Sequence, residues 1–563
     1  MLRQIRQRSW KTGGFVVGAV FLCAGAVQAI DNGGGIQGVV KNGSGEPVSG
    51  AFVKMKNGER RLTFMVISQA LGRYTASNLP PGKYEVQGVG GDFQSEMSAP
   101  VEVTAGRPAT LDLSLTVQRA PDLPHAWPGM LPGQIAGEGG GNSTVQVNLP
   151  DGDGKPIVQA KCTVCHGVGI IASARFDRKR WEDVIEEMRS YAQGSTIPMK
   201  DLTEQESKTL LEYVTANFSN EGRGRAARPV ADPNSRLPRT LMQGAEAKYI
   251  AVEFTLPNPK SEPHEVTVDL QGNAWASQRT AGHLGKLDPK TLNYAEFDPP
   301  AGKSPMHLNG ITRAPDGKIW FVDASANRRF ISLDSKTMEY NLYPLPKLKT
   351  GRASGNTMRV APDGSVWLAS VGANEMIRLQ PSTKEFTVYS VPAGVKAQRN
   401  AAPYGIAIDG DEKIWFVENA MNGLGRITPS TGQIDEFKVP VENAVPRKAG
   451  MDSQGNVWFG LHFAGKLMKV DYKTLKMSVF TPPTENAGVY SIQGDTKSRY
   501  IWMSEQHADK IARFDPQTEQ FLEFPLATAE EDNRRIEIDP TNSNRIWWSG
   551  NVSGRVGYIE VMN

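Results

Sequence analysis

Two cysteines and a histidine form the motif that carries chemistry most clearly. Cys162, Cys165 and His166 stand in the order C-x-x-C-H, the attachment pattern of a c-type haem. Two thiols three residues apart can form thioethers to the porphyrin vinyl groups, and the adjacent imidazole can bind the iron. A structural zinc site would need further ligands nearby, and a redox disulfide would leave His166 without a role. The motif therefore predicts one covalent haem c with His166 as an axial ligand.

A methionine is the expected second axial ligand, and the sequence offers two candidates. Met199 lies in a loop before a predicted helix, which Thr203 and Glu206 open as a capping box. Met188 ends an apolar stripe that begins at Trp181 and is typical of a helix, so it also has a packing role. This stretch resembles class I cytochromes c, in which a loop methionine before the last helix binds iron. The resemblance implies Met199, with Met188 as the alternative, and thioether ligation suits electron transfer.

The start of the chain predicts export. Basic residues precede an apolar run over residues 14–26, and the small residues that follow fit a cleavage site at the end of a signal peptide, residues 1–29. No later run approaches the length needed to cross a bilayer, so we expect no membrane span in the mature chain. The sequence therefore predicts a periplasmic or secreted protein.

Composition narrows the class of protein. The chain has 563 residues, of which 39% are apolar and 22% charged, as in ordinary globular proteins. The formal net charge of +3 is too balanced to make nucleic acid the main partner. The 57 glycines and 37 prolines favour short strands and many turns.

A repeat occupies the C-terminal part of the chain. Each copy has a short apolar strand with a tryptophan, and successive tryptophans lie 43 to 48 residues apart. They are Trp275, Trp320, Trp367, Trp415, Trp458, Trp502 and Trp547. This period predicts a seven-bladed β-propeller over residues 246–563, with the tryptophans packed between blades. The last copy is one strand short, and residues 252–257 are predicted to complete it and so hide an edge.

The repeats contain the patterns D-G-x-I-W-F, G-R-I-T-P and P-Y-G-I-A, and through them the propeller resembles the streptogramin lyase (virginiamycin B lyase-like) family. The resemblance implies a lyase that opens a cyclic depsipeptide ester by elimination. It also implies magnesium, histidines in P-H-x-I motifs of the last two blades, and an acid in the last blade. Here Tyr490 and Arg534 stand at the two histidine positions, the Ser549-Gly550-Asn551 segment has no carboxylate, and only the first blade has Pro263-His264.

Three further segments precede the propeller. Residues 34–116 alternate apolar and polar with frequent turns and resemble the carboxypeptidase-regulatory-like sandwich, which implies an accessory or docking module. Residues 149–219 form the predicted cytochrome c domain, between linkers at 117–148 and 220–245. The predicted fold class is therefore mainly β: a seven-bladed propeller preceded by a small all-α cytochrome c domain and an N-terminal β-sandwich.

The starts of the innermost strands should meet at one end of the propeller channel and form a polar funnel for a small molecule. The predicted funnel residues are His264, Asn309, Asn356, Tyr404, Arg447, Tyr490 and Arg534. The segments after each tryptophan and a neighbouring histidine should add Asp323, Glu418, Glu505, His462, His507 and His307 to the same face.

Several roles remain open for the funnel. His264 is a candidate catalytic base, with Arg447 or Arg534 holding an anionic substrate. The histidines and glutamates could also hold a divalent metal ion. Alternatively, these positions are polar only because they face loops, and the acids of blades two, four and six pair with cations of the blade turns.

The combined prediction is an exported haem c protein that transfers electrons, with the propeller binding a small-molecule substrate or a redox partner protein. This favours an oxidoreductase. The alternatives are a streptogramin-lyase-like C–O lyase with an appended cytochrome, and a non-enzymatic electron carrier or docking protein.

Overall fold

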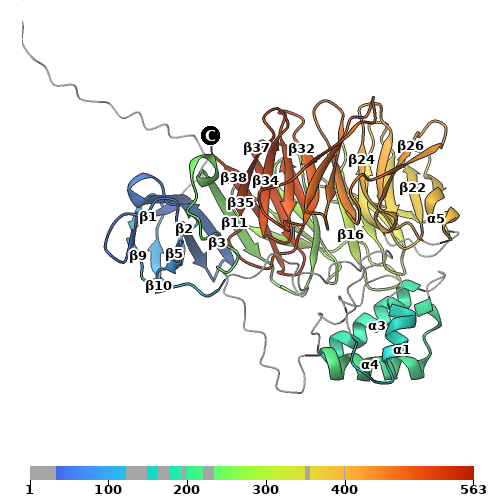
Figure 1. Cartoon of the computed structure of the whole chain (residues 1–563), viewed down its shortest axis with the longest axis horizontal. Coiled ribbons are helices and arrows are strands. Elements are labelled where there is room, and N and C mark those ends of the chain that lie inside the picture. The colour runs from blue at the N-terminus through green and yellow to red at the C-terminus, as the bar shows by residue number, and fades with distance from the viewer. Residues whose placement is uncertain are drawn as a thin grey trace, which may run out of the picture.

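The computed structural model describes residues 33–121, 149–162, 171, 177–192, 198–219, 234–348, 355–398 and 400–562 (Figure 1). The predicted signal peptide, Cys165, His166 and most of both predicted linkers lie outside these described residues. The described chain is mainly β, with an N-terminal sandwich, a short helical segment and a propeller.

The propeller consists of seven blades of four antiparallel strands each, and six of these blades are separate sheets. Blade one contains β12 (Pro263–Val268), β13 (Ala274–Gln278), β14 (Leu284–Leu287) and β15 (Tyr294–Phe297). Blade two contains β16 (Leu308–Arg313), β17 (Ile319–Asp323), β18 (Arg329–Asp334) and β19 (Glu339–Pro344). Blade three contains β20 (Gly355–Val360), β21 (Val366–Ser370), β22 (Glu375–Gln380) and β23 (Glu385–Ser390), and α5 (Pro392–Lys396) follows it. Blade four contains β24 (Pro403–Ile408), β25 (Ile414–Glu418), β26 (Gly423–Ile427) and β27 (Ile434–Lys438).

The remaining blades repeat the pattern. Blade five contains β28 (Pro446–Met451), β29 (Val457–Leu461), β30 (Lys466–Val470) and β31 (Met477–Phe480). Blade six contains β32 (Val489–Gly494), β33 (Ile501–Glu505), β34 (Lys510–Asp515) and β35 (Gln520–Pro525). Blade seven contains β36 (Asn533–Asp539), β37 (Asn542–Gly550), β38 (Arg555–Val561) and β11 (Tyr249–Thr255).

The repeated tryptophans are structural, as predicted. Each lies on the second strand of its blade and is buried. In six blades its ring packs on an aromatic residue of the fourth strand, with centroids 5.2 to 6.0 Å apart. In several blades the indole N–H also donates to an aspartate after the first strand, as from Trp415 to Asp409 at 2.8 Å. These contacts explain why the tryptophan recurs: it fastens the strands of one blade and fills the space beside the next.

The predicted closure of the propeller is confirmed, with a small shift in position. β11 pairs antiparallel with β38, from Tyr249 opposite Val561 to Thr255 opposite Arg555. The strand therefore begins and ends slightly earlier than the predicted residues 252–257. It stops before Pro257, which has no backbone N–H to offer to a ladder.

The sandwich has two sheets. One contains β1 (Gly34–Asn42), β4 (Arg73–Leu79), β8 (Pro108–Thr110) and β9 (Leu113–Leu115). The other contains β2 (Phe52–Asn57), β3 (Leu62–Ile67), β5 (Gly82–Gly90), β6 (Phe93–Gln94), β7 (Val101–Val103) and β10 (Val117–Gln118), and the short helix η1 (Ala70–Gly72) follows β3.

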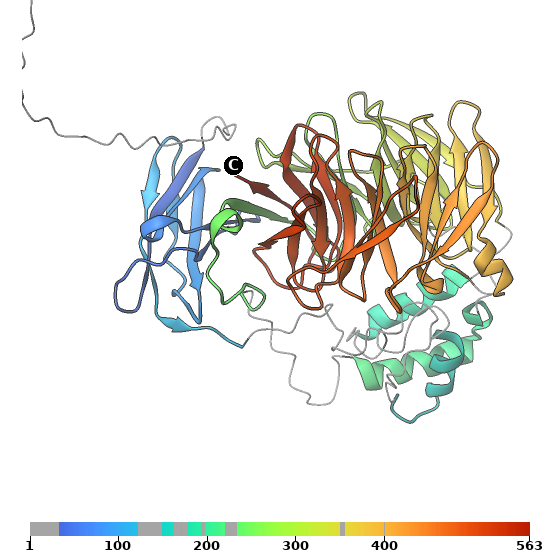
Figure 2. The ribbon, with the colours of Figure 1, turned by 45° about the horizontal axis from the view of Figure 1, so that its top comes forward.

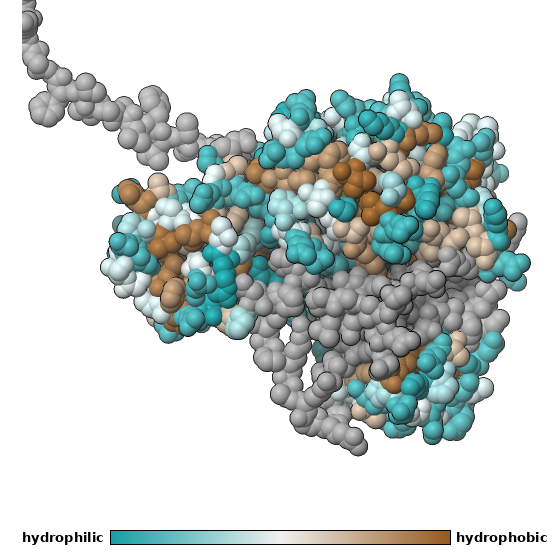
Figure 3. Space-filling model, in the orientation of Figure 1, coloured by the Kyte–Doolittle hydropathy of each residue, from teal (hydrophilic) through white to brown (hydrophobic). Residues whose placement is uncertain are grey.

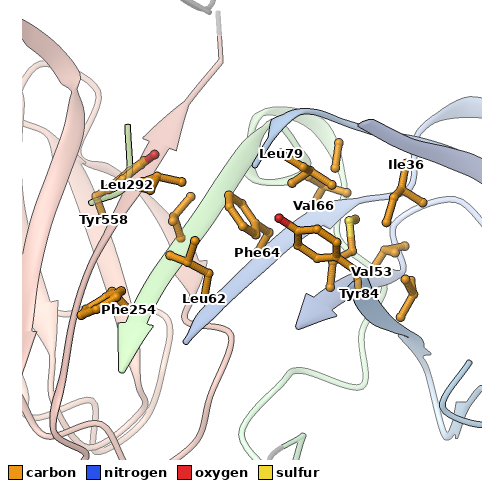
Figure 4. Packing of buried hydrophobic residues seen from close by; sticks show 14 of the residues in the cluster. Ile36, Val53, Leu62, Phe64, Val66, Leu79, Tyr84, Phe254, Leu292 and Tyr558 are labelled. Carbon is orange, nitrogen blue, oxygen red and sulfur yellow. The ribbon is translucent and has the colours of Figure 1, made fainter. Parts of the chain in front are cut away.

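The sandwich and the propeller share one sheet. β3 pairs antiparallel with the outer edge of β11, from Leu62 opposite Phe254 to Val66 opposite Ile250. Sandwich strands and blade seven thereby form a continuous ten-stranded sheet. Phe64 packs beside the joint, with its ring centroid 6.2 Å from that of Tyr84 (Figure 4). The edge that the outermost strand of blade seven would expose is thus covered.

One arginine ties together the two ends of the segment that lies between the sandwich and the propeller in sequence. Arg119, just after β10, donates from Nη2 to the backbone carbonyls of Asn234 at 2.8 Å and Leu237 at 2.7 Å. The Asn234 side chain in turn donates to Gln87 and Gln94 of the sandwich, at 3.0 and 2.8 Å. The described chain therefore leaves the sandwich after Arg119 and resumes beside it at Asn234.

The helical segment contains α1 (Lys155–Ile157), η2 (Val158–Cys162), α3 (Arg178–Ala192), η3 (Pro198–Asp201) and α4 (Glu204–Phe218), and η4 (Gly244–Ala247) precedes β11. The predicted capping box is confirmed, because Thr203 Oγ1 accepts from the Glu206 backbone at 3.2 Å while the Glu206 carboxylate accepts from the Thr203 backbone. The helices lie against one end of the propeller (Figure 2). Among the described residues, no helix has both the length and the apolar character needed to cross a membrane.

We expect Phe64→Ala to weaken the joint sheet. Truncating this buried ring should lower the free energy of unfolding by about 3 kcal/mol. The sandwich contains no tryptophan, and eight of the ten tryptophans that follow the predicted signal peptide lie in the propeller, so tryptophan fluorescence in a urea titration reports mainly the propeller. Phe93→Ala is the matched control, because Phe93 is 47% exposed on the sandwich, where apolar surface gathers (Figure 3). A fluorescence midpoint that Phe64→Ala leaves unchanged would contradict coupling between sandwich and propeller.

Candidate functional site

The seven predicted funnel residues occupy equivalent positions. Each is the second residue of the innermost strand of its blade: His264 on β12, Asn309 on β16, Asn356 on β20, Tyr404 on β24, Arg447 on β28, Tyr490 on β32 and Arg534 on β36. In every blade the pairing register shifts directly after the first residue of this strand. Each funnel residue therefore sits in a β-bulge, a device that redirects side chains. The side chain of Asn356 lies outside the described part of the structure.

The side chains of blades four to six pack on one another. The hydroxyl groups of Tyr404 and Tyr490 are 2.5 Å apart and share a hydrogen bond. The Arg447 guanidinium lies over both rings, 5.4 and 5.8 Å from their centroids. All three residues are buried. The expected funnel is here a compact polar cluster.

Two histidines from the segments after the tryptophan strands join this cluster. His462 follows β29 and His507 follows β33, and their ring centroids are 4.6 Å apart. The His462 ring also lies edge-on to Tyr490, at 5.1 Å. Burial lowers the pKa of His462 well below its ordinary value, and the nearby charges of His507 and Arg447 lower it further. His462 is therefore a neutral imidazole near neutral pH.

An acid and an amide complete the arrangement. Arg534 Nε donates to both carboxylate oxygens of Asp532, at 2.9 and 3.0 Å. The Gln506 amide donates to the same carboxylate, and its oxygen lies 2.6 Å from His462 Nε2. We call this set the mouth cluster: Tyr404, Arg447, His462, Tyr490, Gln506, His507, Asp532 and Arg534. The sequence interpretation missed Asp532 and Gln506, although each adjoins a predicted site residue or lies two positions from one.

His264 lies apart from the histidines of the mouth cluster. It is buried in blade one, and burial, followed by the charges of Arg279 and Arg534, lowers its pKa well below the ordinary value. His307 accepts a hydrogen bond from Arg279 at 2.8 Å. The structure therefore does not group His264 with His462 and His507.

The predicted acids have different partners. Asp323 pairs with Arg329 Nε of the next strand at 3.2 Å, as expected for a blade-turn cation. Glu418 instead faces another carboxylate: burial, and then Glu436, raises the pKa of Glu418 to about 8. Burial and the carboxylate of Glu523 likewise raise the pKa of Glu505 well above its ordinary value.

A buried ion pair crosses the channel next to the funnel positions. Glu265 and Lys448 directly follow His264 and Arg447 in sequence, come from blades one and five, and form an ion pair. Both side chains are fully buried. Burial, and then the charges of Arg535 and Arg534, lowers the pKa of Lys448 well below its ordinary value. The pair therefore joins the innermost strands of two blades that are not neighbours in the ring, next to two funnel positions in sequence.

The helical segment meets the propeller at the same end. Arg180 Nη2 of α3 lies 3.3 Å from Glu262 Oε1, immediately before β12. Within the helical segment, Cys162 and Met199 pack on one apolar cluster together with Trp181 and Ile185. Met188 is partly buried against this cluster. Cys165, the second predicted attachment residue, and His166, the predicted axial ligand, lie outside the described residues.

Within the described parts of the chain, no three His, Cys, Asp or Glu side chains form a group that could hold a metal ion.

Both the propeller and the sandwich are similar to known protein families. A family model described as the virginiamycin B lyase family matches residues 246–430 and 305–563, and a carboxypeptidase regulatory-like domain matches residues 35–116. A virginiamycin B lyase of Nocardia farcinica (strain IFM 10152) is 23% identical over 229 residues, which cover 35% of this chain and 76% of that protein.

A solved structure agrees on the propeller fold. A streptogramin B lyase structure is 24% identical to this chain in sequence. The match covers 57% of this chain and 100% of the lyase chain, with a TM-score of 0.50. A catalytically inactive virginiamycin B lyase from Staphylococcus aureus with quinupristin is 22% identical and covers 56% of this chain and all of that one, with a TM-score of 0.49.

We expect Glu418→Gln to change how stability depends on pH. The raised pKa means that folded Glu418 keeps its proton while the unfolded chain loses it. Wild-type stability should therefore fall as the pH rises from about 4.5 to about 8. The glutamine variant should lose less stability over that interval in urea titrations at several pH values. An identical decline in both proteins would contradict the assignment.

Proposed function

The chain belongs to the virginiamycin B lyase family. We propose that its propeller binds a small carbonyl compound at the mouth cluster and cleaves a C–O bond of that compound by elimination. The observation that carries this proposal is the neutral imidazole of His462, in ring contact with Tyr490 and near the guanidinium of Arg447. A proton acceptor and positive charge thus share one buried place. Arg534 has 16% of its side chain exposed.

Elimination next to a carbonyl needs these two elements. A base must take the proton from the carbon beside the carbonyl, and positive charge must stabilise the oxygen that gains electron density. His462 would take that proton, and the released electron pair forms a carbon–carbon double bond. The C–O bond on the next carbon breaks, and the oxygen leaves as a carboxylate. Arg447 and Arg534 would stabilise the developing negative charge.

Magnesium, which the family resemblance implies, does not suit the residues present. This ion prefers carboxylate oxygens and water. The two motif positions hold Tyr490 and Arg534, and a guanidinium repels a cation. The carboxylate of the cluster, Asp532, already accepts hydrogen bonds from Arg534, Gln506 and Asn551. The arginines therefore supply positive charge in this proposal.

Quinupristin, the compound in the relative's structure, is a suitable first probe. We expect the protein to convert it to a product with a new chromatographic retention and an unchanged mass, because elimination within a ring adds no atoms. Conversion should persist in EDTA. Arg447→Met should slow it by about a hundredfold if this charge stabilises the oxyanion. Arg107→Met, at an exposed position of the sandwich, is the matched control. A product that has gained water, or no conversion of quinupristin or simpler esters, would refute the lyase proposal.

Electron transfer by a haem c is a second candidate function, and it requires that the protein be exported. The C-x-x-C-H motif supports it, and so does the packing of Cys162 and Met199 on one apolar cluster, because thiol and thioether groups are the donors such a haem uses. Cys162 and Cys165 would hold the porphyrin, and His166 and Met199 would bind the iron. The bound group would supply single-electron transfer. Arg180 of the same segment contacts the end of the propeller that carries the mouth cluster.

Spectra of the protein matured in a periplasm test this candidate. Met199→Ala should abolish the weak methionine-to-iron charge-transfer band, whereas Met188→Ala should leave it. Cys162→Ala should weaken covalent haem retention on a denaturing gel. A band lost in the Met188 variant alone would assign the ligand to Met188. A protein without haem after correct maturation would refute electron transfer while leaving the lyase proposal intact.

A further inference from the structure

Three side chains of the mouth cluster are connected in a fixed order. The Asp532 carboxylate accepts hydrogen bonds from Arg534 Nε and Asn551 Nδ2, the latter at 3.1 Å. Because the Asp532 carboxylate is paired with the Arg534 guanidinium, it is ionised and has no proton to donate. The Gln506 side chain must therefore turn its NH2 group toward Asp532 and donate the hydrogen bond. The Gln506 oxygen must therefore face His462.

The orientation of the amide determines the tautomer of the imidazole. His462 Nε2 lies 2.6 Å from the Gln506 oxygen, which can only accept, so Nε2 carries the hydrogen. Because burial and the positive charges of His507, Arg447 and Arg534 keep the ring neutral, Nδ1 has no hydrogen. The order Asp532, Gln506, His462 thus presents a lone pair at Nδ1.

This lone pair has no hydrogen-bond partner among the residues that the structure describes. His462 is only 4% exposed, and a hydrogen-bond acceptor that is buried without a partner is unfavourable. His507 and Tyr490 flank the ring without bonding to Nδ1. A ligand that brings a proton to this atom would remove the cost.

We infer that Asp532 and Gln506 are positioning residues that hold His462 with Nδ1 unprotonated, and that Nδ1 is the atom that receives the substrate proton. The inference rests on the proposed elimination and deepens it. Substrate binds with its acidic C–H toward His462, and its carbonyl oxygen meets the positive charge of Arg447. His507 is held differently, because its Nδ1 lies 3.2 Å from a backbone carbonyl, that of Asn486.

Nitrogen NMR of the full-length protein with labelled histidines tests the tautomer without any substrate. Comparison with His462→Gln identifies the signals. We expect a single neutral tautomer for wild-type His462, with hydrogen on Nε2. Gln506→Met, which cannot accept, should give a mixture of tautomers. Gln506→Glu keeps an acceptor and should restore the single form. Gln454→Met, on an exposed turn of blade five, is the matched control. Hydrogen on Nδ1 in the wild type, or a tautomer unaffected by Gln506→Met, would overturn the inference.

Turnover of quinupristin separates this inference from the proposed function. Gln506→Met should slow elimination at least about tenfold, since a wrong imidazole tautomer disables a base. Gln506→Glu should retain activity but move its onset to higher pH, because added negative charge favours the imidazolium. A loss of stability alone would not move that onset. If the tautomer is as expected but the wild type eliminates nothing, the proposed function fails and the positioning of His462 stands. Equal rates and pH profiles in all variants would overturn the inference.

Discussion

The fold depends on hydrogen bonding along both edges of β11. One edge pairs with β38 and closes the propeller, and the other pairs with β3 of the sandwich. Each pairing satisfies backbone groups that would otherwise form an open strand edge. Because closure fixes the positions of all seven blades, it also fixes where their innermost strands begin. The site at the end of the channel is therefore a consequence of ring closure.

Repetition explains why side chains from distant parts of the sequence meet. Every blade starts its innermost strand with the same bulge, so the second residue of each strand reaches the same end of the channel. Differences among blades then decide the chemistry. Aromatic and basic residues in blades four to seven form a packed polar cluster, while Glu265 and Lys448 of blades one and five form a buried ion pair. A uniform scaffold thus carries a site that is not symmetric.

The sequence predicted the parts of the structure that arise from local periodicity. Spacing of the tryptophans predicted the blades, and the missing last strand predicted β11. Aligning the repeats on their tryptophans also placed Tyr404, Arg447, Tyr490 and Arg534 at equivalent positions. It could not show that His462 contacts Gln506, or that Gln506 contacts Asp532, because these contacts join different blades. The sequence also could not predict that β3 of the sandwich pairs with β11 of the propeller, since each of these strands could have remained at the edge of its own sheet.

Arg119 has a consequence for how this chain could have arisen. It joins the end of the sandwich to the backbone at Asn234 and Leu237, so the chain leaves the β structure and returns to it at neighbouring points. An insert of this geometry can be exchanged or excised without altering the registers on either side. In evolutionary terms the helical segment is an exchangeable insertion. An ancestral protein without it could already have had the present sandwich and propeller.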